Sequence, residues 1–297
     1  MYLCPEKFNM SLISETDLII NPDGSIYHLN LLPEDLADTI ITVGDPERVA
    51  QVSRYFDRIE LKKGKREFIT HTGFLGTKRL SVVSTGIGTD NIDIVFNELD
   101  ALKNIDFQTR QIKTELCALD LIRIGTSGSI QEDLPVGTIL ASSHGLGLDT
   151  LMNFYMDAPE AADAQLLSEI KQHLKGFEAV QPYLSSANNS LLQEIAADLD
   201  HGITVTAPGF YAPQGRQVRA AAKYPDLIAR LGSFESDHLR ITNLEMETAG
   251  IYALAKVLGH RALSINAILA SRVKRAFSPD PLVIVDRAIQ HVLDRIS

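Results

Sequence analysis

The sequence predicts an α/β fold, specifically a three-layer αβα sandwich built around a central mixed β-sheet. Short apolar runs alternate along the chain with segments in which apolar residues recur at helical spacing. This alternation is typical of a sheet whose two faces are covered by helices. The 297 residues, of which 45% are apolar, also provide enough chain to bury the core that such a fold requires.

The predicted elements follow one another from residue 39 onward. Asp45 and Pro46 mark the start of the first helix, because Asp accepts from free backbone N–H groups and Pro needs no partner there. The predicted strands are 39–44, 79–86, 118–128, 137–145, 202–207 and 261–272. The predicted helices are 45–56, 91–103, 166–175, 190–199, 245–259 and 279–296.

The segment before the first strand contains the turn signal "NPDG". We therefore expect residues 1–35 to form an N-terminal arm and residues 36–297 to form a single domain. The charge run "KKGKREFIT" follows at residues 62–70. Its three lysines are expected in a solvated turn, and Arg66 is expected to open the next strand.

Charge and cysteine content argue against several classes of protein. A formal net charge of −10 argues against general nucleic-acid binding, which requires a basic face. Cys4 and Cys117 make neither a disulfide framework nor a zinc site, and they fit a reducing, cytoplasmic compartment. The N-terminus lacks a signal-peptide pattern, and no apolar run is long enough to span a membrane. None of the eight histidines has metal-ligand spacing.

Ligands of such sheets bind beyond the carboxyl ends of the strands, so the residues there are the candidates for function. The first strand ends in "VGDPER", where Gly44 permits close backbone approach and Arg48 lies near the free N–H groups of the helix start. Together they could bind an anion. On this segment alone, a well-capped helix with a solvated arginine is the better explanation.

Arg123 lies within the apolar strand of "LIRIGTSGS", and a buried charge without a partner is very costly. The hydroxyl and N–H groups of Thr126 and its neighbours could hold a phosphate oxygen close by. A buried carboxylate would serve Arg123 equally well as a partner. Both explanations stay open at this point.

Glu245 and Glu247 flank Met246 in "NLEMETAG". On the predicted helix these carboxylates lie on different faces, so they are not expected to share one site. One of them could accept two hydrogen bonds from a sugar diol. Acidic residues are also favourable at any helix start, which is the simpler explanation of the pair.

The segment "GFYAPQGRQVR", residues 209–219, places the planar amide of Gln214 near the planar guanidinium of Arg216. Its Pro and Gly residues indicate irregular backbone, and a loop has no packing need for these two side chains. Two other glycine-rich stretches are less informative. "STGIGTDN" lacks the third glycine of the dinucleotide fingerprint, and "GTSGS" is not a nucleophile elbow.

Seven short motifs occur in the order in which one known family carries them: "YHLN", "GDPERV", "REFIT", "VVSTGIG", "RIGTSG", "FYAPQGR" and "NLEMETAG". From about residue 26 to its C-terminus the chain resembles the hexameric purine and uridine phosphorylase type of the nucleoside phosphorylase superfamily. Within this type it is most similar to the uridine phosphorylases. The resemblance implies the nucleoside phosphorylase fold and a pentosyltransferase reaction, the reversible phosphorolysis of uridine to uracil and ribose 1-phosphate.

The resemblance implies a cradle for inorganic phosphate, the co-substrate. "GDPERV" matches one half of the family's phosphate site and "RIGTSG" matches the other half. "REFIT" matches a segment whose arginine reaches the phosphate of a neighbouring subunit. The implied phosphate ligands are Gly44, Arg48, Arg123 and Thr126, with Arg66 acting across the interface.

The ribose site is implied in the same way. "NLEMETAG" matches the ribose-binding segment, so Glu247 would bind the 2′- and 3′-hydroxyls and Met246 would pack against the sugar. "YHLN" matches a segment whose His, here His28, reaches a neighbour's 5′-hydroxyl. Because Arg66 and His28 would both act across an interface, a homo-oligomer is implied, with a dimer as the minimum active unit and a hexamer as the family's form.

"FYAPQGR" is similar to the family's uracil-recognition loop. Phe210 would pack on the base, Gln214 would bind O2 and N3–H, and Arg216 would donate to O4. Cytosine presents a donor at that position, and the unpaired contact would cost about 1–3 kcal/mol. Purine members place an Asp after the late strand, where this chain has Arg272 instead, which favours a pyrimidine. The expected catalytic residues are Arg216, Gln214 and Arg123.

The chain departs from the family at Thr89, Asp90 and Asn91, where relatives usually have small residues and a proline. In bacterial relatives this turn helps to hold a potassium ion between subunits, and here Glu67 and Asn91 could supply oxygen ligands. No other cofactor is implied. The alternatives are a purine nucleoside phosphorylase, a nucleosidase of the same superfamily or a non-catalytic nucleoside-binding protein. Tolerance for thymidine or 2′-deoxyuridine is not determined by these motifs.

Overall fold

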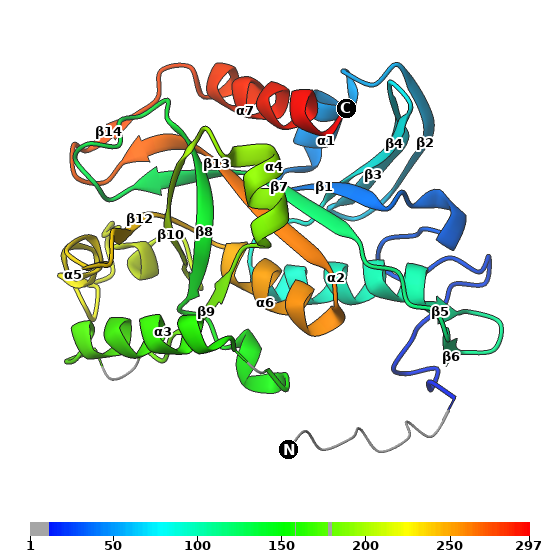
Figure 1. Cartoon of the computed structure of the whole chain (residues 1–297), viewed down its shortest axis with the longest axis horizontal. Helices are drawn as coiled ribbons and strands as arrows, with labels where there is room; N and C mark the ends of the chain where they lie inside the picture. The colour runs from blue at the N-terminus through cyan, green and yellow to red at the C-terminus, as the bar shows by residue number, and fades with distance from the viewer. Residues whose placement is uncertain (1–11, 158, 178–179) are drawn as a thin grey trace.

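A mixed sheet of twelve strands forms the centre of the protein (Figure 1). The computed structural model describes residues 12–157, 159–177 and 180–297. Along the sheet the strands follow the order β11-β12-β10-β8-β13-β7-β1-β4-β3-β2, with β9 paired to β8 and β14 paired to β13. The strands of this sheet are β1 (Thr39–Val43), β2 (Arg58–Lys65), β3 (Phe68–Leu75), β4 (Lys78–Ser84), β7 (Asp120–Ser129), β8 (Ile139–Gly147), β9 (Tyr183–Ser186), β10 (Asp200–Thr206), β11 (Glu235–Ser236), β12 (Leu239–Glu245), β13 (Arg261–Ser271) and β14 (Ala276–Phe277).

Part of the sheet closes on itself. β12 pairs with β10 in parallel and also with the end of β7 in the antiparallel direction, where Asn243 lies opposite Ser129. Strands β7, β12, β10, β8 and β13 therefore form a closed ring. β1 and β4 extend the sheet from β7 in parallel, and β3 and β2 complete it in antiparallel pairs. A separate small sheet pairs β5 (Ile105–Asp106) with β6 (Gln111–Ile112).

Helices cover both faces of the sheet, which confirms the predicted α/β sandwich. α1, α4 and α7 supply apolar side chains to one buried cluster, whereas α2 and α6 supply a second cluster on the opposite side (Figure 1). A third cluster lies beneath α3 and α5. The helices are α1 (Pro46–Ser53), α2 (Thr89–Asn104), α3 (Ala161–His173), α4 (Asn189–Ala196), α5 (Leu227–Gly232), α6 (Thr248–Leu258) and α7 (Pro281–Ile296), with 3₁₀ turns η1 (Pro33–Asp35), η2 (Leu151–Phe154) and η3 (Ala212–Gln214).

The first helix begins as its sequence predicts. The side chain of Asp45 accepts a hydrogen bond from the backbone N–H of Glu47 at 2.9 Å, and Pro46 occupies the first helical position. This cap fixes the turn that leaves β1 at Gly44. The carboxyl end of β1 therefore lies at the edge of the sheet where other strands also end.

The charge run at residues 62–66 differs from its prediction. The lysines lie on the edge strand β2 rather than in a solvated turn. Lys63 Nζ lies 2.7 Å from Asp35 Oδ2, and Lys65 Nζ donates to the carbonyl of Tyr27 at 2.6 Å. Arg66 lies in the turn between β2 and β3 with φ of 57°, so it does not open a strand. The prediction was wrong because alternating lysines on an edge strand look like a polar turn.

Residues that precede the first strand contribute to the core. Leu18, Ile26, Leu29 and Leu31 are buried in the same cluster as apolar residues of α2 and α6. The predicted division at residue 35 stays a prediction, and residues 1–11, with Cys4, lie outside the described residues. Among the described residues, Cys117 is free and exposed.

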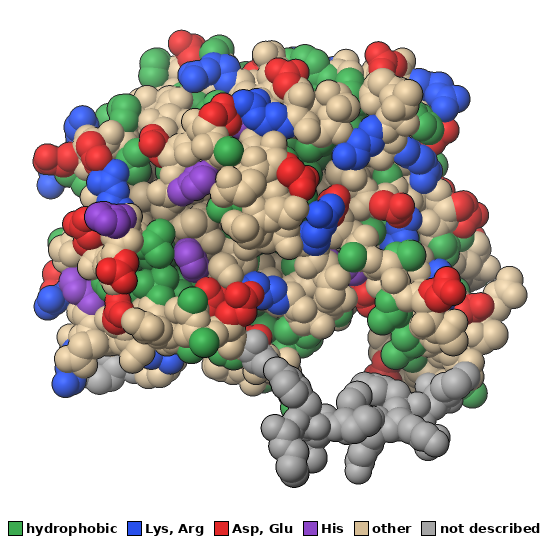
Figure 2. Space-filling view, in the orientation of Figure 1, with side chains coloured by type: hydrophobic (Ala, Val, Ile, Leu, Met, Phe, Trp, Pro, Cys, Tyr) green, Lys and Arg blue, Asp and Glu red, His purple; other side chains and the backbone are tan. Residues whose placement is uncertain are grey.

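Acidic and basic side chains are interspersed over the face of the molecule seen in Figure 2. No helix within the described ranges is long and apolar enough to cross a bilayer. Within those same ranges, no cluster of three or more His, Cys, Asp or Glu residues has the arrangement of a metal site.

Candidate active site

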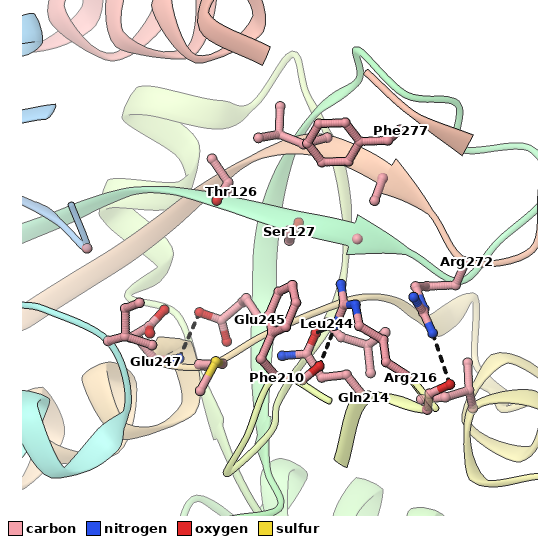
Figure 3. Close-up of a pocket in the computed structure, with 18 of the residues that line it drawn as sticks. Thr126, Ser127, Phe210, Gln214, Arg216, Leu244, Glu245, Glu247, Arg272 and Phe277 are labelled. Atoms are coloured by element: carbon pink, nitrogen blue, oxygen red, sulfur yellow. Dashed lines mark hydrogen bonds between the residues drawn. The ribbon is translucent and has the colours of Figure 1, made fainter. Parts of the chain in front are cut away.

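A cavity of about 1520 Å³ opens beyond the carboxyl ends of β1, β7, β12 and β13 and beneath the loop that follows β10 (Figure 3). The structure brings most of the predicted site residues to its wall. We call one part the sheet end, defined by Gly44, Arg48, Arg123, Thr126, Glu245, Met246 and Glu247. We call the other part the loop end, defined by Phe210, Gln214, Arg216, Ile228 and Arg272.

Arg123 is buried, with 4% of its surface exposed, and is held by two carboxylates. Its Nη2 lies 2.6 Å from Oε2 of Glu247 and 2.9 Å from Oε2 of Glu245. Its Nη1 donates to Oδ1 of Asn266 at 3.1 Å. Burial alone would lower the pKa of Arg123, but the two carboxylates outweigh burial and raise this pKa. The ion-pair explanation for Arg123 therefore holds, and its role toward phosphate stays a prediction.

A glycine makes this position of Arg123 possible. Gly125 lies two residues along β7 on the same face, and a Cβ atom there would lie 1.7 Å from Arg123 Nη1. The guanidinium therefore lies across the backbone of its own strand. Any larger residue at position 125 would displace it from the two carboxylates.

The expectation that Glu245 and Glu247 belong to different sites was wrong. Residue 245 ends strand β12, and α6 begins only at Thr248, so the backbone between the two carboxylates is not helical. Oε2 of Glu245 also accepts from the backbone N–H of Thr248, the first residue of α6, at 2.9 Å. The pair shares one guanidinium, and this contact requires the extended strand end.

Glu247 is positioned between Arg123 and the turn before α2. Its Oε1 accepts from the backbone N–H of Gly88 at 2.9 Å, while its Oε2 faces Arg123. Burial raises the pKa of Glu247 and the charge of Arg123 opposes this rise. The carboxylate is thus fixed by two partners at the wall of the cavity, next to the half-buried side chain of Met246.

Arg48 adds a second cation at the sheet end. Its Nη1 donates weakly, at 3.4 Å, to the carbonyl of Ile124. Burial and then the charge of Arg123 lower the pKa of Arg48, whereas Asp45 and Glu247 raise it. Two arginines that repel each other beside Thr126 make this part of the cavity suited to an anion.

The loop end is organised by Arg216. Its Nη1 donates to the carbonyl of Phe210 and to Oε1 of Gln214, both at 2.7 Å, and its guanidinium lies 3.7 Å above the ring of Phe210. Gln214 is 3% exposed, whereas Phe210 is 51% exposed. Gly215 has φ of 66°, a left-handed conformation that ends the 3₁₀ turn η3, and the chain reverses there toward the cavity. The amide and guanidinium therefore lie together, as Figure 3 shows.

Arg272 follows β13 and anchors the same loop. Its Nη2 donates to the carbonyl of Gly215 at 3.1 Å. Its Nε is buried and makes no hydrogen bond within the described part of the chain. An arginine and not an acid therefore occupies this position beside the loop end.

Two predicted residues, His28 and Arg66, lie away from the wall of this cavity. Nδ1 of His28 is 2.6 Å from Oε1 of Glu98, and the backbone N–H groups of His28 and Leu29 also donate to that carboxylate. Arg66 is exposed in its turn. Glu67 and Asn91 do line the cavity, close together around Gly86. If His28 and Arg66 contribute to a cavity of this kind, it must be the cavity of another copy of the chain.

Comparison with known proteins decides the family. The family model described as "Phosphorylase superfamily" matches residues 38–281. The chain belongs to the phosphorylase superfamily.

Relatives of this phosphorylase are similar over most of their length. A solved nucleoside phosphorylase from Trypanosoma brucei, described as showing uridine phosphorylase activity, is 32% identical with a TM-score of 0.85. The match covers 94% of this chain and 99% of that one. The uridine phosphorylase of Thermococcus kodakarensis is 29% identical over 86% of this chain and 80% of its own length. The uridine phosphorylase of Escherichia coli is 28% identical over 85% of this chain and 88% of its own length.

Three residues of this phosphorylase site were missed or misread from the sequence. Glu245 was assigned to a helix, although a strand end next to a buried arginine is a signal for an ion pair. Asn266 was read only as part of strand 261–272, and nothing local indicates that it faces Arg123. Arg275 was not considered, although it follows a strand that ends at the site. The place of each of these residues in the site can be recognised only when distant strands are placed side by side.

Proposed function

We propose that the protein catalyses the reversible phosphorolysis of uridine, giving uracil and ribose 1-phosphate. The observation that carries this proposal is the pairing of Gln214 with Arg216 at one end of a cavity whose other end presents Arg48, Arg123 and Glu247. Such a cavity offers groups for a base edge, a sugar diol and an anion in one continuous space. The relatives named above support the same assignment.

In the proposed mechanism, phosphate is bound at the sheet end by Arg48, Arg123 and Thr126. Holding the nucleophile beside C1′ removes the entropic cost of bringing it there. A phosphate oxygen forms a bond to C1′ while the C1′–N1 bond breaks, and the electron pair of that bond leaves on uracil. Glu247, fixed by Gly88 and Arg123, accepts hydrogen bonds from the ribose 2′- and 3′-hydroxyls.

The loop end would stabilise the negative charge that develops on the departing uracil. Oε1 of Gln214 has two lone pairs, so it can accept from N3–H while it also accepts from Arg216. Its amide N–H donates to O2, and Arg216 donates to O4. These contacts strengthen as charge moves onto the ring, so they favour the transition state over the bound substrate.

Uracil release from uridine is expected only when phosphate is present. The purified protein is incubated with uridine, with and without inorganic phosphate, and free uracil is measured. Inosine serves as the comparison substrate. Release without phosphate would make the protein a nucleosidase, and preferential cleavage of inosine would make it a purine enzyme. Binding without turnover of either would leave a nucleoside-binding protein.

We further propose that the active unit is at least a dimer, as part of a hexamer, in which Arg66 and His28 complete the site of a neighbouring subunit. The exposure of Arg66 supports this proposal, as does the finding that neither side chain lines its own cavity. Glu98 contacts both the ring and the backbone N–H of His28, so it would hold the imidazole in a fixed orientation. Sedimentation of the purified protein measures the oligomeric state, and a monomer would contradict the proposed dimer or hexamer.

Mixed oligomers provide a functional test of this sharing. Arg66→Ala and Glu247→Gln are each expected to lower kcat by about 10²–10³. Co-refolding the two variants places an intact Glu247 beside an intact Arg66 in one site of each mixed pair, so about a quarter of all sites in an equal mixture should recover. Mixing each variant with itself is the control. Absence of recovery in the mixture would show that Arg66 does not act across an interface.

A potassium ion near Glu67 and Asn91 is also proposed. Asn91 donates through Nδ2 to the carbonyl of Ile87 at 3.3 Å, which leaves its oxygen for an ion, and Glu67 supplies a carboxylate next to it. Oxygen donors of this kind suit a hard cation, which would link subunits. Thermal unfolding in potassium chloride compared with choline chloride tests the proposal, and identical midpoints would contradict it.

We propose a cytoplasmic location because Cys117 is a free, exposed thiol, which persists in a reducing compartment. Cell fractionation measures this directly.

A further inference from the structure

A chain of side-chain hydrogen bonds runs once around the closed ring of β7, β12, β10, β8 and β13. It starts at Arg123 on β7, takes one polar side chain from each of the other four strands, and returns to β7 at Ser127, which lines the cavity (Figure 3). The four middle members are fully buried and do not line the cavity. We call this chain the polar belt, defined in order by Arg123, Asn266, Ser142, Thr204, Asn243 and Ser127.

The links of the polar belt are short. Nδ2 of Asn266 donates to Oγ of Ser142 at 2.9 Å, and the hydroxyl oxygens of Ser142 and Thr204 are 2.6 Å apart. Thr204 donates to Oδ1 of Asn243 at 2.9 Å, and Nδ2 of Asn243 donates to Oγ of Ser127 at 2.8 Å. Buried hydrogen bonds that follow one another in this way strengthen each other. The belt therefore holds its side chains in one arrangement.

Arg123 sets the direction of the belt, because a guanidinium can only donate hydrogen bonds. The amide of Asn266 must turn its oxygen toward Arg123 and its NH₂ group toward Ser142. Thr204 uses its single proton on Asn243, so Ser142 is the donor in the contact between the two hydroxyls. Turning the Asn266 amide over would bring its NH₂ group against the N–H of Arg123, which leaves buried donors unpaired.

Asn266 also determines how Arg123 distributes its N–H groups. The carboxylates of Glu245 and Glu247 both contact the same nitrogen, Nη2. Nη1 donates to Oδ1 of Asn266 at 3.1 Å and lies 3.4 Å from the hydroxyl of Ser264. The remaining N–H, on Nε, has no partner among the residues that the structure describes and is not fully enclosed by protein atoms. Since Arg123 lines the cavity, this N–H is the donor left for a ligand.

The loss of Asn266 would free the guanidinium to turn. A carboxylate is best matched by two parallel N–H groups of one guanidinium. If Nη1 had no acceptor, Arg123 could rotate to present Nη1 and Nη2 together to Glu245 or Glu247. The N–H on Nε would then leave its present direction.

We propose that Asn266 is a positioning residue for the phosphate co-substrate and acts through Arg123. The inference rests on the proposed function, in which Arg123 binds phosphate. The polar belt fixes the amide of Asn266, this amide fixes the plane of the guanidinium, and the plane directs the N–H on Nε toward the anion. Because Asn266 does not line the cavity, it touches neither phosphate nor nucleoside. Its effect is therefore expected in the affinity for phosphate and not in the affinity for uridine.

The test replaces Asn266 by leucine, which has nearly the same size and no acceptor. We expect the KM for phosphate, and the Kd for phosphate measured by calorimetry, to rise about tenfold, the equivalent of about 1.4 kcal/mol. The KM for uridine should stay within about twofold of the wild-type value. Glu247, the proposed ribose ligand, keeps the backbone N–H of Gly88 as a second partner in this variant.

Asn104→Leu is the matched control. Asn104 is also buried, and its amide forms hydrogen bonds with Asp100 and with the backbone of Cys117, but it does not line the cavity. Denaturant unfolding should show a loss of stability comparable to that of Asn266→Leu. The KM values for phosphate and uridine should both stay at the wild-type level.

Ser142→Ala is a milder change that keeps the inference testable if Asn266→Leu does not fold. It removes the acceptor of Asn266 Nδ2 and leaves only the hydroxyl of Ser264, at 3.3 Å. The amide is then held less firmly, so the KM for phosphate should rise about threefold, as expected for the loss of one buried hydrogen bond. The KM for uridine should again be unchanged.

The outcomes separate this inference from the proposed function. Unchanged phosphate affinity in folded Asn266→Leu, or in Ser142→Ala if Asn266→Leu does not fold, would overturn the inference and leave uridine phosphorolysis in place. An equal loss of affinity for phosphate and uridine would indicate a general distortion of the site, and an equal effect of Asn104→Leu would indicate lost stability. Either result would also overturn the inference. No phosphate-dependent release of uracil by the wild type would refute the proposed function itself.

Discussion

Replacing Arg123 by methionine is expected to abolish measurable activity and to destabilise the fold by about 3–5 kcal/mol. The guanidinium is the shared partner of Glu245 and Glu247, so its removal leaves two buried carboxylates without a counter-charge. The same change removes a proposed phosphate ligand. Denaturant unfolding measures the loss of stability, and phosphate-dependent uracil release measures the loss of activity, which we expect to reach at least about 10³-fold.

Two further variants measure the structural role of Arg123. Combining Arg123→Met with Glu245→Gln and Glu247→Gln removes the uncompensated charges, so stability should partly recover. Activity should stay lost, because this variant lacks the proposed ribose ligand Glu247 as well as Arg123. Arg240→Met is the matched control, because Arg240 forms an exposed ion pair with Asp133 that is worth at most about 1 kcal/mol. If the neutral triple variant regained uracil release, Arg123 would have no direct role in the reaction.

Replacing Arg216 by alanine is expected to lower kcat for uridine by about 10²–10³. Arg216 contacts the carbonyl of Phe210, the oxygen of Gln214 and the face of the Phe210 ring, so its loss removes three contacts that organise the loop proposed to bind the base. The KM for phosphate should change little, because phosphate is assigned to the sheet end. Steady-state kinetics with uridine and phosphate varied separately distinguish the two effects.

The control for this variant is Arg219→Ala, which removes an exposed arginine three residues further along the same segment. It should leave kcat within about twofold of the wild type, as surface changes usually do. The relative rates of uridine and cytidine give a second measurement, because Arg216 is the group assigned to reject the cytosine amino group. Unchanged turnover and unchanged base preference in Arg216→Ala would refute its assignment.

The arrangement of layers could be predicted because the relevant signals are local. Apolar runs such as 39–44 and 118–128 lie where β1 and β7 are found, and the Asp45–Pro46 cap marks the start of α1. Two of the strands that were missed, β2 and β12, have a different pattern. β2 is an edge strand rich in lysine, and β12 ends in a polar segment that resembles a helix start.

The site could be predicted only as separate pieces. The motifs identify Arg123 and Glu247 individually, but their contact joins residues 124 positions apart in the chain. Whether a buried arginine meets phosphate or a carboxylate depends on which strand lies beside it. The pairing of β7 with β12 decides this, and no local pattern in either strand encodes that pairing. The contact of Arg272 with Gly215 likewise appears only after β13 and the loop are brought together.

The closed ring of β7, β12, β10, β8 and β13 has a consequence for how this enzyme can change over evolution. Arg123 and Glu245 belong to strands that are directly hydrogen-bonded to each other, so their separation is set by the backbone of the ring. The loop at 209–219 leaves the ring at the end of β10, and Arg272, at the end of β13, donates to its Gly215. Substitutions or insertions in that loop can therefore alter the proposed base contacts while the arrangement of Arg123 and Glu245 is kept.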